Sequence, residues 1–283
     1  MEDLDFVTPA RTKIYDPVVA LAFFKSAGSP ESVAQGKSFF VENERTDGMF
    51  SKGAKMYLLL DGEVSLTVRN KGIATLGKDA IFGEMATIGQ LPRSATAVAK
   101  SDCRVISLDE RQFRRAIGKA PEFALMLMNI IIERLRLAVA LLIGPRVLSD
   151  DETLKRRSVF EKQLLADLVA EFDGHAPVHA PARKVIMTEG ESGAFMYVVL
   201  KGRIVVTIKN RVVERVGPGG VVGEMALVDQ APRVGTATAE TECTLLAINR
   251  KDFLLFVKTK PDFSLSLMKG LAERLRYMNS QFK

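Results

Sequence analysis

A glycine, a glutamate and an arginine stand at a fixed spacing in two stretches of the sequence. The first stretch is FGEMATIGQLPRSATAVA at residues 82–99, and the second is VGEMALVDQAPRVGTATA at residues 222–239. Glu84 precedes Arg93 by nine positions, and Glu224 precedes Arg233 by the same number. One such stretch could form a surface ion pair beside a tight turn, but its repetition at constant spacing favours a shared chemical purpose.

The residue types of the first stretch suit the binding of an anion. A short helix that begins at Gly83 would direct its first backbone N–H groups toward a phosphate, and glycine permits the close approach. Those groups belong to Glu84, Met85 and Ala86. The planar guanidinium of Arg93 can bond two phosphate oxygens at once, which a lysine cannot do. A cyclic phosphodiester of a ribose carries one negative charge and a free hydroxyl group. Since the phosphate would repel the Glu84 carboxylate, we expect Glu84 to accept a hydrogen bond from that hydroxyl group.

The repetition extends over most of the chain. It predicts two copies of one domain, because the two halves align without a gap from Met56 to Arg136. The aligned segments are KMYLLLDGEVSLTVRN (55–70) with FMYVVLKGRIVVTIKN (195–210), CRVISLDERQF (103–113) with CTLLAINRKDF (243–253), and PEFALMLMNIIIERLR (121–136) with PDFSLSLMKGLAERLR (261–276). Upstream, SFFVENE (38–44) aligns with VIMTEGE (185–191) only if the first copy carries about seven extra residues near RTDGMFS, which we interpret as a loop insertion.

Within each copy, short apolar runs rich in Val, Ile, Leu and Thr are separated by Gly or Asn, which is typical of strands. After the last run the periodicity becomes helical, with Phe113 in one short helix and Pro121 at the start of a longer one. Further helices are expected at 158–172 and, in the first copy, at 16–24. The expected fold is mainly β with α: two tandem domains, each a β-sandwich or jelly roll with flanking helices. We expect domain A at 1–143, a polar linker at 144–157 and domain B at 158–283.

From about residue 17 to 282 the chain resembles a tandem of cyclic-nucleotide-binding domains, whose phosphate-binding cassette reads Gly-Glu, a hydrophobic turn, then Pro-Arg and small residues. This resemblance implies an eight-stranded jelly roll (double-stranded β-helix), a cassette helix that holds the phosphate, and a C-terminal helix that closes over the base as a lid. In the first copy it assigns the ligand site to Gly83, Glu84, Met85, Ala86, Arg93, Ser94 and Ala95.

In the second copy the corresponding site residues are Gly223, Glu224, Met225, Ala226, Arg233 and Val234. Val234 stands where Ser94 offers a hydroxyl group, so we expect the second site to bind more weakly or to be a degenerate site. Gly235, in place of Ala95, is expected to free space there. The ligand expected at both sites is a 3′,5′-cyclic nucleotide, with cyclic AMP favoured over cyclic GMP. The base is expected to meet lid and barrel residues, for which Asn129, Arg134 and Arg136 are candidates.

Composition and charge add several expectations. The net charge of +6 would suit an anionic ligand or a polyanion, but it is spread along the chain without a long basic block, so charge alone does not decide between them. Cys103 and Cys243 hold equivalent positions in the two copies, so we expect two core cysteines in a cytoplasmic setting. The apolar stretch 123–143 is long enough to span a membrane, but Glu133 and two arginines near its middle favour burial against protein.

Three further features have structural interpretations that we favour. His175 and His179 have a proline between them and no third ligand nearby, so no metal site is expected. LKRRSVF at 154–160 resembles a basophilic kinase site at Ser158, yet such clusters are usually solvated linker charges. A set of apolar positions on the long helix could support a homodimer or simply pack against its own barrel. These are Leu127, Met128, Ile131, Leu135 and Leu142.

The favoured function is a cyclic-nucleotide-binding regulatory protein that signals to an unidentified effector protein by moving its lid helices. A transcription regulator of the cyclic-AMP-receptor class would need a helix-turn-helix after the long helix, where this chain continues into a second sensor domain, so no sequence-specific nucleic acid is expected. A scaffold with one degenerate site is the other alternative. Kinase regulatory subunits share the tandem, but residues 1–16 show no Arg-Arg-x-Ser-like segment. We expect no catalytic residues and no cofactor, since no Ser/His/Asp or Cys/His set is evident.

Overall fold

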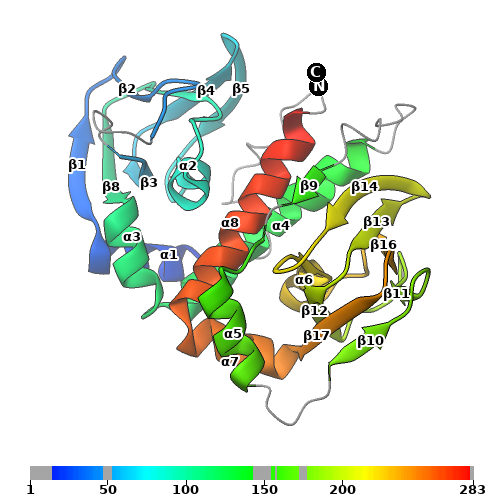
Figure 1. Ribbon diagram of the computed structural model, residues 1–283. Helices are drawn as coiled ribbons and strands as arrows, with labels where there is room; N and C mark the ends of the chain where they lie inside the picture. Colours follow the sequence, from blue (N-terminus) through cyan, green and yellow to red (C-terminus); the bar gives the residue numbers. More distant parts are fainter. Residues whose placement is uncertain (1–14, 47–52, 143–153, 157, 172–176, 281–283) are drawn as a thin grey trace. The chain divides into compact units, whose positions relative to one another are not determined.

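The computed structural model describes residues 15–46, 53–142, 154–156, 158–171 and 177–280. The chain divides into two compact units, each built around β-strands (Figure 1). Unit 1 contains the chain up to Arg134 together with Met268–Asn279, and unit 2 contains Leu135–Leu267 and the last residues. The domain limits expected at residues 143 and 158 lie at the edges of undescribed segments and stay a prediction.

Unit 1 contains eight strands that form two four-stranded antiparallel sheets. The strands are β1 (Ser29–Val33), β2 (Ser38–Phe40), β3 (Lys55–Asp61), β4 (Val64–Val68), β5 (Lys71–Leu76), β6 (Ile81–Phe82), β7 (Thr96–Ala99) and β8 (Cys103–Asp109). One sheet has the order β1-β8-β3-β6 and the other β2-β7-β4-β5, so that, apart from the β4-β5 pair, neighbours in a sheet are not consecutive in the sequence. This is the eight-stranded jelly roll that the resemblance to cyclic-nucleotide-binding domains implied.

Unit 2 repeats this topology. Its strands are β10 (Val178–Ala180), β11 (Val185–Met187), β12 (Phe195–Lys201), β13 (Ile204–Ile208), β14 (Arg211–Val216), β15 (Val221–Val222), β16 (Thr236–Ala239) and β17 (Cys243–Asn249). The orders are β10-β17-β12-β15 and β11-β16-β13-β14, and β9 (Leu154–Arg156) extends the second sheet by pairing in parallel with β14. The sequence pattern did not predict β9, which lies in the expected linker; the rest of that linker is outside the described residues.

The loop insertion in the first copy is confirmed by equivalent hydrogen bonds in the two copies. Asn43 N donates to Arg93 O at 2.9 Å, and Gly190 N donates to Arg233 O at the same distance. Both Asn43 and Gly190 have positive φ, so they occupy the same turn in the two copies. The alignment with about seven extra residues in the first copy therefore describes equivalent backbone positions.

Eight helices flank the strands among the described residues. They are α1 (Pro17–Ala27), α2 (Glu84–Gly89), α3 (Glu110–Ile117), α4 (Pro121–Leu142), α5 (Lys162–Glu171), α6 (Glu224–Asp229), α7 (Arg250–Thr259) and α8 (Pro261–Ser280). Phe113 lies in α3 and Pro121 begins α4, as predicted. Asp109 and Gln112 form a capping box that fixes the start of α3. The helix expected at 158–172 begins later, at Lys162, because Val159 N and Phe160 N bond instead to Gly219 O.

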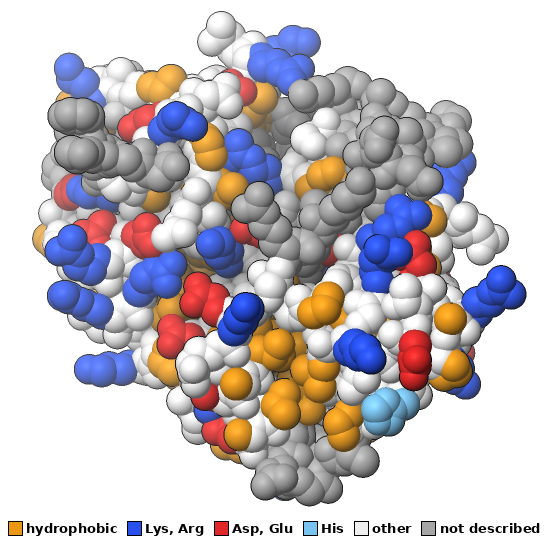
Figure 2. Space-filling model, in the orientation of Figure 1, with side chains coloured by type: hydrophobic (Ala, Val, Ile, Leu, Met, Phe, Trp, Pro, Cys, Tyr) orange, Lys and Arg blue, Asp and Glu red, His pale blue; other side chains and the backbone are white. Residues whose placement is uncertain are grey.

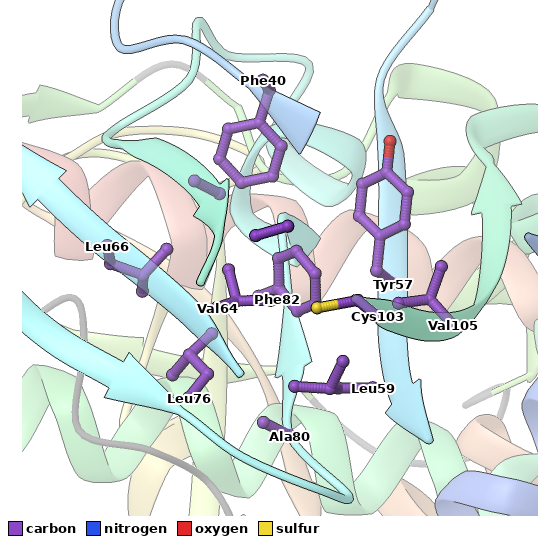
Figure 3. Close-up of a cluster of buried hydrophobic side chains, with 12 residues drawn as sticks. Phe40, Tyr57, Leu59, Val64, Leu66, Leu76, Ala80, Phe82, Cys103 and Val105 are labelled. Atoms are coloured by element: carbon purple, nitrogen blue, oxygen red, sulfur yellow. The ribbon is translucent and has the colours of Figure 1, made fainter. Parts of the chain in front are cut away.

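The interior of the unit 1 jelly roll is filled by apolar side chains from both sheets (Figure 3). Phe40, Tyr57 and Phe82 form its aromatic part, with the Tyr57 and Phe82 rings stacked 5.1 Å apart. Cys103 belongs to this cluster and Cys243 to the matching cluster of unit 2; both thiols are free and buried, as expected for core cysteines. On β3 the cluster residues Tyr57 and Leu59 alternate with Met56 and Leu58, which face the other side of the sheet. Met56 and Leu58 are buried as well, which is why this strand reads as a short apolar run.

The long helix α4 is buried along the positions considered for helix pairing. Leu127, Met128, Ile131 and Leu135 are all 0% exposed, so for them the burial interpretation holds. The side chain of Leu142, the fifth position, is outside what the structure describes.

No helix among the described residues is long and apolar enough to cross a membrane. On the face drawn in Figure 2, basic and acidic side chains are interspersed.

Candidate functional site

Cassette 1 (residues 82–94) and cassette 2 (residues 222–234) each contain, as their second residue, a glycine that no other residue could replace without strain. Gly83 has φ 78° and Gly223 has φ 83°, in the left-handed region. A Cβ added to Gly83 would lie 2.8 Å from Lys55 O and 3.0 Å from Arg93 Nη1. One added to Gly223 would lie 2.4 Å from Arg233 Nη1. Each glycine is therefore required both by the turn and by the arginine packed against it.

The turn at Gly83 leads into α2, whose six residues are all buried. No side chain caps the start of this helix, and the same is true at Gly223 and α6. Backbone N–H groups in the first turn of a helix have no partner within the helix itself. Met85 and Ala86, expected to lie near the ligand, are 9% and 3% exposed. The structure thus contains the short helix with a glycine start that the sequence predicted.

Arg93 is a buried cation beside the start of α2. Its residue is 4% exposed, and its Nη1 donates to Lys55 O at 2.9 Å and to Gly83 O at 3.0 Å. The guanidinium carbon lies 4.2 Å from the centre of the Phe40 ring, in cation–π range. Burial lowers the pKa of the Arg93 guanidinium, although Tyr57 and nearby carboxylates oppose this shift.

The hydrogen bonds of Arg93 leave one edge of the guanidinium unused. Among the described residues, Arg93 forms no ion pair, and its Nε is buried without a hydrogen-bond partner. Removing a charge from water costs several kcal/mol unless an opposite charge and hydrogen bonds compensate. The Nε and Nη2 atoms form the edge that binds two oxygens of an anion side by side. This arrangement is suited to an anionic ligand that completes the coordination of Arg93.

Glu84 is also buried, but it is paired. Arg134 of α4 donates through Nη1 to Glu84 Oε1, and both side chains are nearly inaccessible, with 5% of Arg134 and 6% of Glu84 exposed. Sequence reasoning named Arg134 only as a candidate base contact and missed this pairing. The two residues are 50 positions apart, and only the packing of α4 against cassette 1 brings them together. The carboxylate expected to bind a hydroxyl group is therefore linked directly to the long helix.

Cassette 2 holds its arginine differently. Arg233 is 7% exposed; its Nη1 donates to Gly223 O at 2.6 Å and its Nη2 to Phe195 O at 2.5 Å. Arg93 uses one nitrogen for the two equivalent carbonyl groups, whereas Arg233 uses two. The plane of the Arg233 guanidinium also lies against Gly193, where an added Cβ would be 2.3 Å from Cζ. Glu224 is 1% exposed, so this carboxylate is buried as in cassette 1.

The residues that follow the two arginines differ as the sequence indicates, with one correction. Ser94 and Val234 are both half-buried, and Ala95 is 1% exposed. We expected Gly235 to free space, but this is wrong. A Cβ added to Gly235 would lie 2.7 Å from Thr207 O, so the neighbouring strand β13 already fills that volume.

Like Arg134, the other two candidate base contacts already have partners. Asn129 Nδ2 donates to Leu125 O of its own helix at 3.0 Å. Arg136 lies in unit 2, where it pairs with Asp229 and donates to Pro232 O at 2.8 Å. His175 lies outside the described residues. The described part of the chain contains no group of three or more His, Cys, Asp or Glu residues placed to hold a metal ion.

The sequence profile described as "Cyclic nucleotide-binding domain" matches residues 30–120 and 177–260, which together make up more than half of the chain. Each match contains one complete cassette. The chain therefore belongs to the cyclic nucleotide-binding domain family.

Curated relatives include two cAMP-dependent protein kinase regulatory subunits. The one from Eremothecium gossypii is 26% identical over 203 residues, covering 71% of this chain and 40% of the relative. The one from Yarrowia lipolytica is 29% identical over 204 residues, covering 71% of this chain and 48% of the relative. The chain thus spans less than half the length of these relatives.

Solved structures of kinase regulatory domains are also similar to the chain. The regulatory domain of Toxoplasma gondii PKA with cAMP is 20% identical, with 94% of this chain and 90% of that chain covered and a TM-score of 0.32. A regulatory subunit of a cAMP-independent protein kinase A from Trypanosoma brucei is 19% identical, with 83% and 76% covered and a TM-score of 0.32.

Proposed function

We propose that the chain is a non-catalytic regulatory protein that binds a 3′,5′-cyclic nucleotide at cassette 1, with cyclic AMP favoured modestly over cyclic GMP. The observation that carries this proposal is the buried guanidinium of Arg93, which has no ion pair among the described residues and an unpartnered Nε. Membership of the cyclic nucleotide-binding domain family supports the choice of ligand. Cassette 2 retains Gly223, Glu224 and Arg233 and is proposed as a second, weaker site.

In the proposed complex the cyclic phosphate accepts hydrogen bonds from Arg93 Nε and Nη2. The backbone N–H groups of Glu84, Met85 and Ala86 and the hydroxyl group of Ser94 complete the phosphate site, and Ala95 keeps the following turn compact. Glu84 accepts a hydrogen bond from the free ribose hydroxyl group. Because the donors surround a negatively charged phosphate in a buried site, each charge-assisted bond is stronger than it would be in water.

The ion pair between Glu84 and Arg134 supplies a route from the ligand to the long helix. A ribose hydroxyl group that bonds to Glu84 shares this carboxylate with Arg134, so ligand binding changes the interactions that hold α4. We propose that repositioning of this lid helix is the signal passed to an effector protein. The relatives' names make a protein kinase catalytic subunit one candidate effector. A cytoplasmic location and a homodimer through the long helices stay predictions.

The proposal is tested by calorimetric titration of the full chain with cyclic AMP, cyclic GMP and 5′-AMP. We expect Arg93→Ala to weaken binding of cyclic AMP by about ten- to a few hundredfold, because hydrogen bonds to a charged group contribute about 1.5 to 3 kcal/mol each. Arg104→Ala is the control, since that arginine lies in the same unit and its side chain is 70% exposed. Unchanged affinity in Arg93→Ala, or preferred binding of 5′-AMP, would contradict the proposal.

A further inference from the structure

The loop that precedes Arg93 is held by the last helix of the chain. Within unit 1, Arg276 of α8 donates through Nη1 to Pro92 O at 2.7 Å, and Lys269 Nζ lies 3.4 Å from Gln90 Oε1. A Cβ added to Gly89, the last residue of α2, would lie 3.7 Å from the Cβ of Ala272. The segment of cassette 1 from the end of α2 to Pro92 is thus contacted by three successive turns of α8.

The corresponding loop of cassette 2 is held by the long helix of the first copy. Within unit 2, Arg136 of α4 donates through Nη1 to Pro232 O at 2.8 Å. Its Nε and Nη2 bind the two carboxylate oxygens of Asp229 at 2.5 Å and 3.0 Å. Asp229 is the last residue of α6, so this contact also spans the end of the cassette helix and the proline before the arginine.

These two contacts are equivalent under the sequence repeat, but each one joins different copies. Arg136 aligns with Arg276 and Pro92 aligns with Pro232. We infer that the C-terminal parts of α4 and α8 are exchanged between the copies, so that Arg276 is a positioning residue for the ligand site of the first copy and Arg136 for that of the second. The inference rests on the proposed function, since it concerns the same two cassettes and names the residues that regulate them.

The physical reason lies in the position of the two prolines. Pro92 and Pro232 immediately precede the arginines proposed to bind phosphate, and proline restricts its own φ, so fixing the carbonyl oxygen limits the orientation of the next residue. A guanidinium that is already oriented loses less entropy when the ligand binds. Two arginines of α4 contact the two cassettes: Arg134 pairs with Glu84, and Arg136, two residues later, pairs with Asp229 of cassette 2. One continuous helix therefore connects the ribose acceptor of the first site with the arginine loop of the second.

The two contacts are unequal in strength. At the end of its cassette helix the second copy has Asp229, whereas the first copy has Gly89. Arg136 therefore forms a bidentate, partly buried ion pair, with 25% of its side chain and 8% of that of Asp229 exposed. Among the described residues the side chain of Arg276 donates a hydrogen bond only to the carbonyl group of Pro92 and forms no ion pair. Cassette 2 is accordingly the more firmly held of the two before ligand binds.

The inference is tested in the full chain with one site disabled at a time. Arg233→Ala leaves the first site for measurement and Arg93→Ala leaves the second. Into each background, Arg276→Ala and Arg136→Ala are introduced separately, and cyclic AMP affinity is measured by calorimetry. We expect Arg276→Ala to weaken the first site by about three- to tenfold and to leave the second unchanged, with the converse for Arg136→Ala. Arg276→Lys, which keeps a donor for Pro92 O, should restore part of the affinity.

A second readout needs no ligand. In the ligand-free chain, Arg276→Ala should speed amide hydrogen exchange in residues 84–93 and leave residues 224–233 unchanged, whereas Arg136→Ala should do the opposite. If no variant background binds cyclic AMP but the exchange pattern is crosswise, the proposed function fails and the helix exchange stands. The inference is overturned if each substitution affects the cassette of its own copy, affects both cassettes equally, or affects neither.

Discussion

At the scale of single residues, Arg93 and Glu84 are both buried charges, but only Glu84 has an ion-pair partner among the described residues. Glu84 already has a partner in Arg134, whereas Arg93 has hydrogen bonds to carbonyl groups and no ion pair among the described residues. An arginine can be predicted from sequence as an anion ligand because its spacing from Gly83 and Glu84 repeats. Its unpartnered Nε could not be predicted, because it depends on where β3 places the carbonyl group of Lys55.

Replacement of Glu84 by glutamine should separate ribose recognition from phosphate recognition. The amide keeps the shape of the carboxylate but loses the charge that binds Arg134 and the ribose hydroxyl group. We expect Glu84→Gln to weaken cyclic AMP binding by about tenfold while changing the affinity for 2′-deoxy cyclic AMP much less. Glu63→Gln, at a surface ion pair where 56% of the glutamate side chain is exposed, is the control. If both ligands lose affinity equally, Glu84 does not bind the ribose 2′-hydroxyl group.

At the scale of elements, the cassette depends on a turn that only glycine accepts. Gly83 has a positive φ, and atoms of Lys55, Arg93 and Phe40 lie within 3.1 Å of the position that an added Cβ would take. Gly36 has a similar φ of 79°, yet an added Cβ would meet nothing within 4 Å. A comparison of substitutions at Gly83 and Gly36 therefore separates the free-energy cost of the backbone conformation from the cost of the steric contacts.

Gly83→Ala should therefore destabilise unit 1 more than Gly36→Ala. Both substitutions place alanine in the left-handed region, at about 1 to 2 kcal/mol. Only Gly83→Ala also displaces Arg93 or Lys55, so we expect at least about tenfold weaker cyclic AMP binding for this variant alone. The free energy of unfolding from denaturant titration and the dissociation constant from calorimetry provide the comparison. Equal losses in the two variants would show that the contacts of Gly83 with Arg93 are unimportant.

Much of the element structure could be predicted from the sequence. The strands follow from short apolar runs, the loop insertion from the shifted alignment, and α4 from Pro121 and its helical periodicity. The strand β9 could not be predicted, because the short segment Leu-Lys-Arg forms a strand only by pairing with the edge of β14. The partners of Arg134 and Arg136 could not be predicted either, since these two residues lie only two positions apart on one helix and yet contact different cassettes.

At the scale of the whole chain, the duplicated cassettes are expected to differ in affinity. Val234 removes the hydroxyl donor that Ser94 supplies, and Arg233 uses two nitrogens on carbonyl groups where Arg93 uses one. Fewer donors therefore remain for a phosphate in cassette 2. These features support a strong first site and a weak second site.

The most direct test of this account is the binding stoichiometry of cyclic AMP in three forms of the full chain. By calorimetry we expect the wild type to show a strong and a weaker site, Arg233→Ala to keep the strong site, and Arg93→Ala to keep only the weaker one. A lost hydroxyl donor to a charged group costs about 1 to 3 kcal/mol, so the two affinities should differ by about five- to a hundredfold. If Arg93→Ala and Arg233→Ala each left one site and the two remaining sites had equal affinity, the unequal roles of the cassettes would be contradicted. Full wild-type stoichiometry in both variants would contradict the assignment of Arg93 and Arg233 as the phosphate ligands.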